Sequence, residues 1–205
     1  MPNIVLMCGP SCAGKTFLAE YIKSLNPKTV TLIGFDSYCV DYGHLTPEEI
    51  KNVNYDCPDA YDGHLLASHV KLLKEGKSID RPIYEFATHH RSKETVKINP
   101  SDIIIVEGIM TFQYPELIKL ADLKVFVDAE ESVRFSRRFE RDQKERGRSP
   151  ESIIYQFNHT VIPMQKIYID PMKNIADLVI ENNTNNGPLP MANPLIKAIT
   201  KLLNK

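Results

Sequence analysis

Short runs of apolar residues recur along the chain and alternate with longer segments in which apolar residues follow helical spacing. The short runs are apolar almost throughout, a pattern typical of strands buried on both faces of a sheet. Strands that alternate with helices predict an α/β fold, a doubly wound parallel sheet with helices on both faces. The predicted strands span residues 3–8, 30–35, 102–107, 123–127 and 177–181.

Helix starts are marked in three places by a side chain that can cap a helix, followed by a proline at the first helical position. These pairs are Thr46–Pro47, Ser149–Pro150 and Asn193–Pro194. Glu49 follows Thr46 at the spacing of a capping box. The remaining predicted helices cover residues 15–25, 62–75, 115–121 and 130–145.

The stretch KSIDRPIYEFATHHRSKETVKI, residues 77–98, interrupts this alternation. Pro82 and the alternating residue pattern predict extended chain, folded as a small β-hairpin beside the main sheet. Because loops and insertions on a regular scaffold commonly carry function, we expect this hairpin to contribute to substrate specificity.

The composition is that of an ordinary globular protein and argues against several classes of function. The chain has 205 residues and a formal net charge of −1, so we expect one domain over residues 1–205 that binds neither nucleic acid nor membranes. The four cysteines form no C-x-x-C pair and are followed by no histidine at zinc spacing, which argues against a zinc site. We expect no disulfide framework and no signal peptide, and hence a cytoplasmic protein.

The sequence GPSCAGKT, residues 9–16, matches the phosphate-binding pattern G-x-x-x-x-G-K-[ST] in full, between a predicted strand and a predicted helix. Gly9 and Gly14 allow backbone angles that turn successive N–H groups toward phosphate oxygens. Lys15 supplies positive charge to the β- and γ-phosphates, and Thr16 offers a hydroxyl to Mg²⁺. Since a chance glycine turn would rarely have both flanking elements, the chain is predicted to bind a nucleoside triphosphate.

Cys12 lies inside this loop, where nearby N–H groups and Lys15 favour the thiolate form of its side chain. We therefore predict slow inactivation by thiol reagents that ATP prevents. The alternative is that cysteine is a small residue that merely fits the loop.

Two acidic residues stand where predicted strands end, Asp36 after VTLIGF and Glu107 after DIIIV. In doubly wound sheets, ligands bind outside the carboxyl ends of the strands, so both side chains are expected near the phosphates. One would hold Mg²⁺, directly or through water, and the other would accept a proton from an attacking hydroxyl. Helix capping or a surface position is the alternative for each.

The segment VRFSRRFERDQKERGR, residues 133–148, is rich in arginine. Arg134, Arg138 and Arg141 are predicted to share one helical face, with Arg137 beside them. Like charges at this spacing destabilise a free helix, and a bound triphosphate would relieve their repulsion. The arrangement therefore suits a face that closes over the nucleotide.

An arginine-rich lid is predicted over residues 138–150, with Gly147 as its hinge. Two pairs of opposite charge in the same segment are expected to be exposed ion pairs that stabilise the helix, namely Glu140–Lys144 and Asp142–Arg146.

Six motifs occur in an order and spacing that characterise one family: GPSCAGKT, DSY, NYDCPDAYD, RPIYEFATHHR, VEGI and RRFERDQKERGR. Together they resemble the uridine kinase (uridine–cytidine kinase) family of P-loop kinases, over about residues 3 to 181. The P-loop is common to many folds, whereas NYDCPDAYD, the tyrosine–histidine segment and RDQKERGR are far more specific to this family. The resemblance implies transfer of the γ-phosphate of ATP or GTP to the 5′-hydroxyl of uridine or cytidine, a requirement for Mg²⁺, and a homotetramer.

The resemblance also implies roles for individual residues. The catalytic groups would be Asp36 as the base, Lys15 and Arg141. The residues that bind the nucleoside triphosphate would be Gly9, Ser11, Ala13, Gly14, Lys15, Thr16, Arg141 and Arg146. The residues that bind the nucleoside would be Asp56, Tyr55, Tyr84, Phe86, His89, Arg138, Arg148 and Gln156. Thr16 and Glu107 would lie in the Mg²⁺ shell.

The segment NYDCPDAYD, residues 54–62, is thereby interpreted as a wall of the nucleoside pocket. Asp56 would bind the ribose hydroxyls with help from Arg138, whereas Asp59 and Asp62 would be turn and helix-start groups. The residues around the pyrimidine would be Tyr84 and His89 at its edge, with Tyr55 and Phe86 along its faces.

Three other interpretations remain open. The first is a P-loop kinase that acts on another small alcohol, against which the Tyr84–His89 segment argues. The second is a nucleotide-switched binding module, although the chain has no N-K-x-D guanine motif. The third is a catalytically inactive relative, but Lys15, Asp36 and Arg141 are all present.

Overall fold

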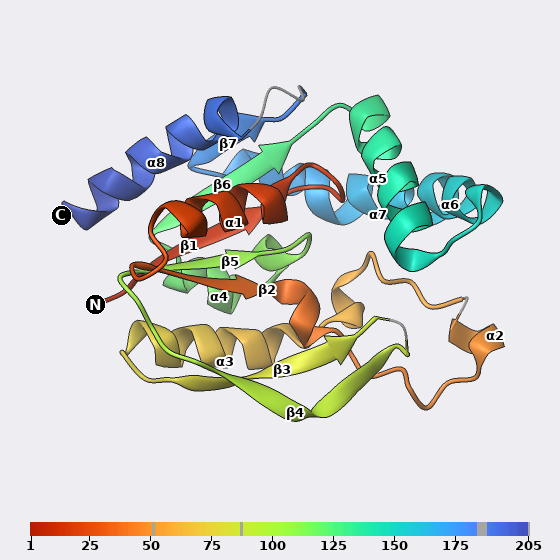
Figure 1. Cartoon of the computed structure of the whole chain (residues 1–205), viewed down its shortest axis with the longest axis horizontal. Helices are drawn as coiled ribbons and strands as arrows, with labels where there is room; N and C mark the ends of the chain where they lie inside the picture. Colours follow the sequence, from red (N-terminus) through yellow and green to blue (C-terminus); the bar gives the residue numbers. More distant parts are fainter. Residues whose placement is uncertain (51, 87, 184–187, 205) are drawn as a thin grey trace.

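A computed structural model of the chain describes residues 1–50, 52–86, 88–183 and 188–204. Within these residues, parallel strands form a central sheet in the order β2-β5-β1-β6-β7 (Figure 1). The strands are β1 (Asn3–Cys8), β2 (Val30–Gly34), β5 (Ile103–Glu107), β6 (Leu123–Asp128) and β7 (Leu178–Glu181). Each strand ends within one residue of its predicted bounds, and the predicted doubly wound parallel sheet is confirmed.

Three helices begin at a capping side chain that was expected from the sequence. Thr46 N donates to Glu49 Oε2 over 2.8 Å while Thr46 Oγ1 accepts from Glu49 N, a reciprocal capping box. Ser149 Oγ and Asp62 Oδ1 likewise accept hydrogen bonds at the starts of their helices. The α-helices are α1 (Lys15–Leu25), α2 (Pro47–Ile50), α3 (Gly63–Lys74), α4 (Pro115–Leu120), α5 (Glu131–Arg146), α6 (Pro150–Gln156), α7 (Ile162–Met164) and α8 (Leu189–Leu203). None of them, in the part of the chain described, has the length and apolar character to cross a bilayer.

Helices cover both faces of the sheet because successive residues of its strands point to opposite sides. In β1, Ile4 and Leu6 pack against α3 and α4, whereas Val5 and Met7 pack against α1 and α8. All four side chains are fully buried. The continuous apolar run of this strand is thus a consequence of burial on two sides.

The last helix begins earlier than the Asn193–Pro194 pair predicts. Helix α8 begins at Leu189, and Pro194 lies inside it. A proline near a helix start removes one intrahelical hydrogen bond, and burial of the apolar face offsets this loss. That face includes Met191 and Leu195, both buried against the sheet.

An antiparallel hairpin lies within the predicted range 77–98, on the far side of α3 from the sheet (Figure 1). Its strands are β3 (Ile79–Glu85) and β4 (His90–Ile98). On β4, Arg91 Nη2 donates to the carbonyl oxygens of Tyr38 (3.1 Å) and Cys39 (2.8 Å). The hairpin is thereby attached to the short 3₁₀ turn Phe35–Tyr38, which directly follows β2.

Candidate active site

The phosphate-binding loop connects β1 to α1 at the carboxyl edge of the sheet (Figure 1). Gly9 and Gly14 have φ angles of 144° and 98°, a region that favours glycine. A Cβ atom on Gly9 would collide with the carbonyl oxygen of Val127. Lys15 is buried, and its Nζ donates to Pro10 O over 3.0 Å. The loop therefore has the backbone conformation and the positive charge that bind phosphate.

A cavity of about 320 Å³ opens at this loop, a size typical of small-molecule sites. Its lining residues are Ser11, Cys12, Gly14, Lys15, Thr16, Phe17, Asp36, Glu107, Gly108, Ile109, Arg137 and Arg141. Asp36, Lys15 and Arg141, the three predicted catalytic residues, thus lie around one cavity, and Asp36 is exposed there. Three members of the predicted nucleotide-binding set are not among the lining residues, namely Gly9, Ala13 and Arg146.

Thr16 and Glu107 meet in this cavity, where Thr16 Oγ1 donates to Glu107 Oε1 over 3.1 Å. Burial raises the pKa of Glu107 to about 7, against the opposing effect of Lys15. Hydroxyl and carboxylate oxygens are the hard ligands that Mg²⁺ prefers, and the ion commonly takes its remaining ligands from water and substrate phosphates. Among the described residues, no larger cluster of His, Cys, Asp or Glu is placed to hold a metal. The pair fits a Mg²⁺ ion shared with a nucleotide.

Asp56 is half-buried near the cavity without lining it. Burial raises its pKa, Arg138 opposes this rise, and Asp36 adds to it. Arg138 also reaches the phosphate loop, where its Nη1 donates to Ser11 Oγ over 3.1 Å. Asp36, Asp56 and the phosphate loop therefore lie close enough for their charges to interact, as an in-line transfer would need.

Aromatic side chains gather between the segment 54–62 and the hairpin. The rings of Tyr55 and His89 are stacked 5.3 Å apart, and Tyr55 Oη lies 2.7 Å from His89 Nδ1. Tyr84 packs edge-on against Phe86 at 5.2 Å, and its buried hydroxyl has no partner among the described residues. These four residues form the predicted pyrimidine-binding set, and the structure places them as two ring pairs, Tyr55–His89 and Tyr84–Phe86.

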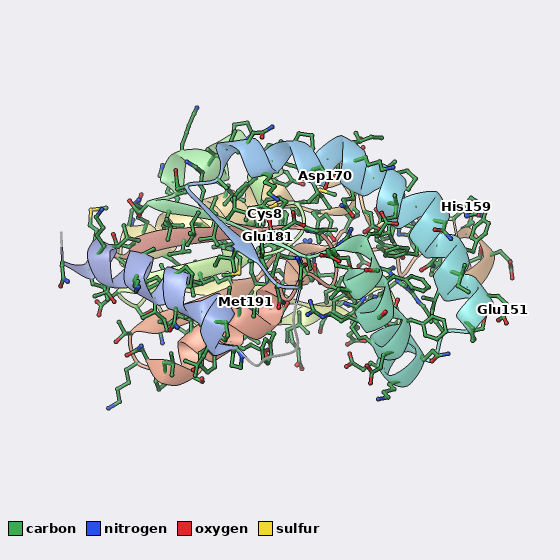
Figure 2. All side chains as sticks on the ribbon, turned by 90° about the horizontal axis from the view of Figure 1, so that it is seen from above. Cys8, Glu151, His159, Asp170, Glu181 and Met191 are labelled. Atoms are coloured by element: carbon green, nitrogen blue, oxygen red, sulfur yellow. The ribbon has the colours of Figure 1, made fainter. Side chains whose placement is uncertain are left out.

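The segment after α5 connects the arginine-rich helix to α6. Gly147, with a φ angle of 60°, ends α5 in the left-handed region. Arg148 Nη1 then donates to Gln156 Oε1 over 2.5 Å, so two predicted nucleoside-binding residues pair with each other. In Figure 2, α5 and the helical segment that carries Glu151 and His159 lie at the right, beyond the carboxyl ends of the strands, whereas α8 runs along the left.

Asp142 was expected to pair with Arg146 on the surface. The pair is present at 3.6 Å, but the surface position is wrong. The Asp142 side chain is 0% exposed and lies among the arginines of the same segment. The partners within the described residues are Arg138, Arg141, Arg146 and Arg148. An acidic residue surrounded by arginines was the available signal, but helical spacing alone does not reveal burial.

The predicted arginine face also differs in one member. Arg134 is buried away from the cavity, and its Nε donates to Ala129 O over 2.9 Å. Arg137 lines the cavity instead, with Nη1 3.4 Å from Cys12 O. The packing of α5 turns Arg134 toward the core, and Arg137, just under one turn further along the helix, faces the cavity.

Asn182 belongs to the site and was not identified from the sequence. The end of β7, marked by Glu181 in Figure 2, leads directly to it. Its Nδ2 donates to Ala13 O over 2.7 Å, and a Cβ atom on Gly14 would collide with its side chain. Its position after a strand at the carboxyl edge was the only sequence signal.

Alkylation of Cys12 is expected to inactivate the protein, and saturating ATP is expected to protect it. Cys12 lines the cavity, whereas Cys8 and Cys39 are buried. With ATP at ten times its Kd, the rate should fall about tenfold by mass action. The half-buried Cys57 provides the control, because Cys57→Ser should keep this protection and Cys12→Ser should remove the inactivation. Equal rates with and without ATP would rule the prediction out.

Comparisons with known proteins agree with this geometry. The sequence model of the phosphoribulokinase/uridine kinase family matches residues 4–187. A uridine kinase of Clostridium novyi is 42% identical over 186 residues, which cover 90% of this chain and 89% of that protein. A uridine kinase of Brevibacillus brevis is 40% identical over 186 residues, covering 90% and 87% of the two chains.

Solved structures share the fold at lower sequence identity. A putative fructose transport system kinase from Silicibacter superposes with a TM-score of 0.68 at 16% identity, covering 87% of this chain and 89% of that one. The family match over most of the chain and the identity to curated relatives both point to the same group of kinases. The chain belongs to the phosphoribulokinase/uridine kinase family.

Proposed function

We propose that the chain is a uridine/cytidine kinase, which transfers the γ-phosphate of ATP or GTP to the 5′-hydroxyl of a pyrimidine ribonucleoside and yields UMP or CMP in pyrimidine salvage. One observation carries the proposal: a single cavity is lined by both the phosphate-loop lysine and an exposed aspartate just after β2. The curated relatives named uridine kinase support the choice of acceptor.

In the proposed reaction, Asp36 accepts the proton of the 5′-hydroxyl as its oxygen bonds to the γ-phosphorus. The bond between that phosphorus and the β–γ bridging oxygen breaks, and ADP or GDP leaves. Lys15 and Arg141 stabilise the charge on the transferred group and the leaving phosphate. Thr16 and Glu107 would hold Mg²⁺, which neutralises phosphate charge when bound.

Nucleoside recognition is assigned to the half-buried Asp56 and the aromatic cluster on the hairpin side. Asp56 would accept hydrogen bonds from the ribose hydroxyls while Arg138 balances its charge. The rings of Tyr55 and Phe86 would lie along the pyrimidine, and the unpartnered Tyr84 hydroxyl would bond its edge. His89 would complete this edge once the base replaces Tyr55 as its partner.

ADP formation measured with a panel of hydroxyl compounds tests the proposal. We expect ADP to form at a substantial rate only when uridine or cytidine is added, because the acceptor must complete the reacting site. Thymidine, pantothenate and a sugar phosphate are the comparison compounds. A similar rate without any nucleoside would indicate a nucleotide switch, and a preference for another alcohol would indicate a different kinase.

The remaining features of the proposal concern the whole protein. We propose that residues 1–205 form one nucleoside kinase domain, with residues 77–98 as its substrate hairpin and 138–150 as its lid. A homotetramer in the cytoplasm is proposed from the family resemblance, and size measurement in solution tests the subunit count.

A further inference from the structure

Asp142 lies at the centre of an arginine cluster at the C-terminal end of α5. Arg141 approaches its Oδ1 with Nε at 2.9 Å and Nη2 at 2.8 Å. Arg148 Nη1 lies 3.3 Å from Oδ2, Arg138 Nε lies 3.5 Å from Oδ2, and Arg146 Nε lies 3.6 Å from Oδ1. The carboxylate, which is 0% exposed, is thus shared among guanidinium groups from the helix and from the segment after it.

The main chain of Asp142 also shapes that segment. Its carbonyl oxygen accepts hydrogen bonds from the N–H groups of Gly147 and Arg148, the latter over 3.1 Å. These bonds end the helix and turn the chain back over it. The side chain and the carbonyl of one residue therefore fix both the arginines and the backbone that carries them.

The cluster faces the phosphate side of the site. Arg141 lines the cavity, and Arg138 donates to Ser11 of the phosphate loop. One carboxylate cannot balance all the positive charges around it, so the arginines retain a surplus that attracts a polyanion. Burial would raise the pKa of Asp142, but Arg141, Arg138 and Arg146 outweigh this effect and the pKa lies below its ordinary value. The carboxylate is therefore ionised at neutral pH.

We propose that Asp142 is a positioning residue, which holds the lid arginines together before nucleotide binds and orients them toward the triphosphate that then shares their charge. The inference rests on the proposed function for its kinetic test, because it names a further residue of that same site. Asp142 acts through the arginines and does not itself contact the reacting atoms.

Asp142→Asn tests this role, because asparagine keeps the size of the side chain and removes its charge. We expect kcat at saturating substrates to fall about 10- to 100-fold, as misplacement of a catalytic group typically does. The matched control is Glu140→Gln on the same helix. Glu140 pairs with Lys144 at 2.6 Å, both side chains are more than half exposed as predicted, and the control should keep wild-type kcat.

A double-mutant cycle separates positioning from a general effect on folding. In an Arg141→Ala background, Asp142→Asn should cost less than about threefold in kcat, because the main group that it positions is gone. An equal loss in both backgrounds would overturn the proposal, and so would wild-type kcat in Asp142→Asn. If Asp142→Asn does not fold, Asp142→Glu and Asp142→Gln form the comparison, and equal kcat in these two variants would overturn it.

Amide hydrogen exchange of residues 143–148 tests the same role without any nucleoside turnover. Without ATP, exchange in Asp142→Asn should be about tenfold or more faster than in the wild type, because the arginine repulsion is no longer balanced. Saturating ATP should restore slow exchange, and Glu140→Gln should change neither rate. Unchanged exchange in Asp142→Asn would contradict the proposal, whereas a wild-type protein without nucleoside kinase activity would contradict only the proposed function.

Discussion

Replacing Asp36 with asparagine is expected to lower kcat about 10²–10⁴-fold, the usual contribution of a general base. Asp36 follows β2 and lines the same cavity as Lys15, so its carboxylate is placed to take the proton of the attacking hydroxyl. An asparagine amide has nearly the same size but does not accept that proton. The KM for uridine should change little, because the ribose and the base are bound by other residues.

Initial-rate kinetics with ATP and uridine at saturation measure this effect. Asp102→Asn is the matched control, since Asp102 is exposed and lies just before β5, at the opposite edge of the sheet. The control should retain wild-type kcat. A wild-type kcat in Asp36→Asn would remove Asp36 from the chemistry, and Glu107 would then be the remaining candidate base in the cavity.

The fold could be predicted because its signals are local in the sequence. A strand buried on both faces is apolar along most of its length, as β1 and β5 are, and such runs are visible without any tertiary information. The start of α6 was predicted for the same reason, because its capping residue Ser149 directly precedes the helix in the sequence. The start of α8 was missed because apolar packing of Met191 and Leu195 determines it, despite the proline inside the helix.

The candidate site likewise has a part that local sequence predicts and a part that depends on tertiary packing. Gly9, Gly14 and Lys15 belong to one short loop, so their spacing alone predicts a phosphate site. The burial of Asp142 and the contact of Asn182 with the phosphate loop depend on how distant elements pack. A helical pattern predicts the direction in which a side chain points but not which other residues cover it. Asp142 was therefore assigned to a surface ion pair, although it lies buried at the centre of the arginine cluster.

Uridine is expected to exceed 2′-deoxyuridine in kcat/KM by at least about 10²-fold, since a site built to bind a hydroxyl rejects a substrate that lacks it. Asp56 is half-buried, with its charge balanced in part by Arg138. A deoxyribose would leave one of its oxygens without a hydrogen-bond partner and away from bulk water. The preference should therefore arise from this carboxylate.

Asp56→Ala should lower kcat/KM for uridine much more than for 2′-deoxyuridine, so that the ratio of the two approaches one. The removal of the carboxylate takes away both the bond to the 2′-hydroxyl and the unpaired charge that penalises its absence. Asp59→Asn, at an exposed position three residues along the same segment, should leave the ratio unchanged. If the wild-type enzyme used both nucleosides equally well, Asp56 would not be the residue that binds the ribose, and the wall formed by residues 54–62 would need a different ligand.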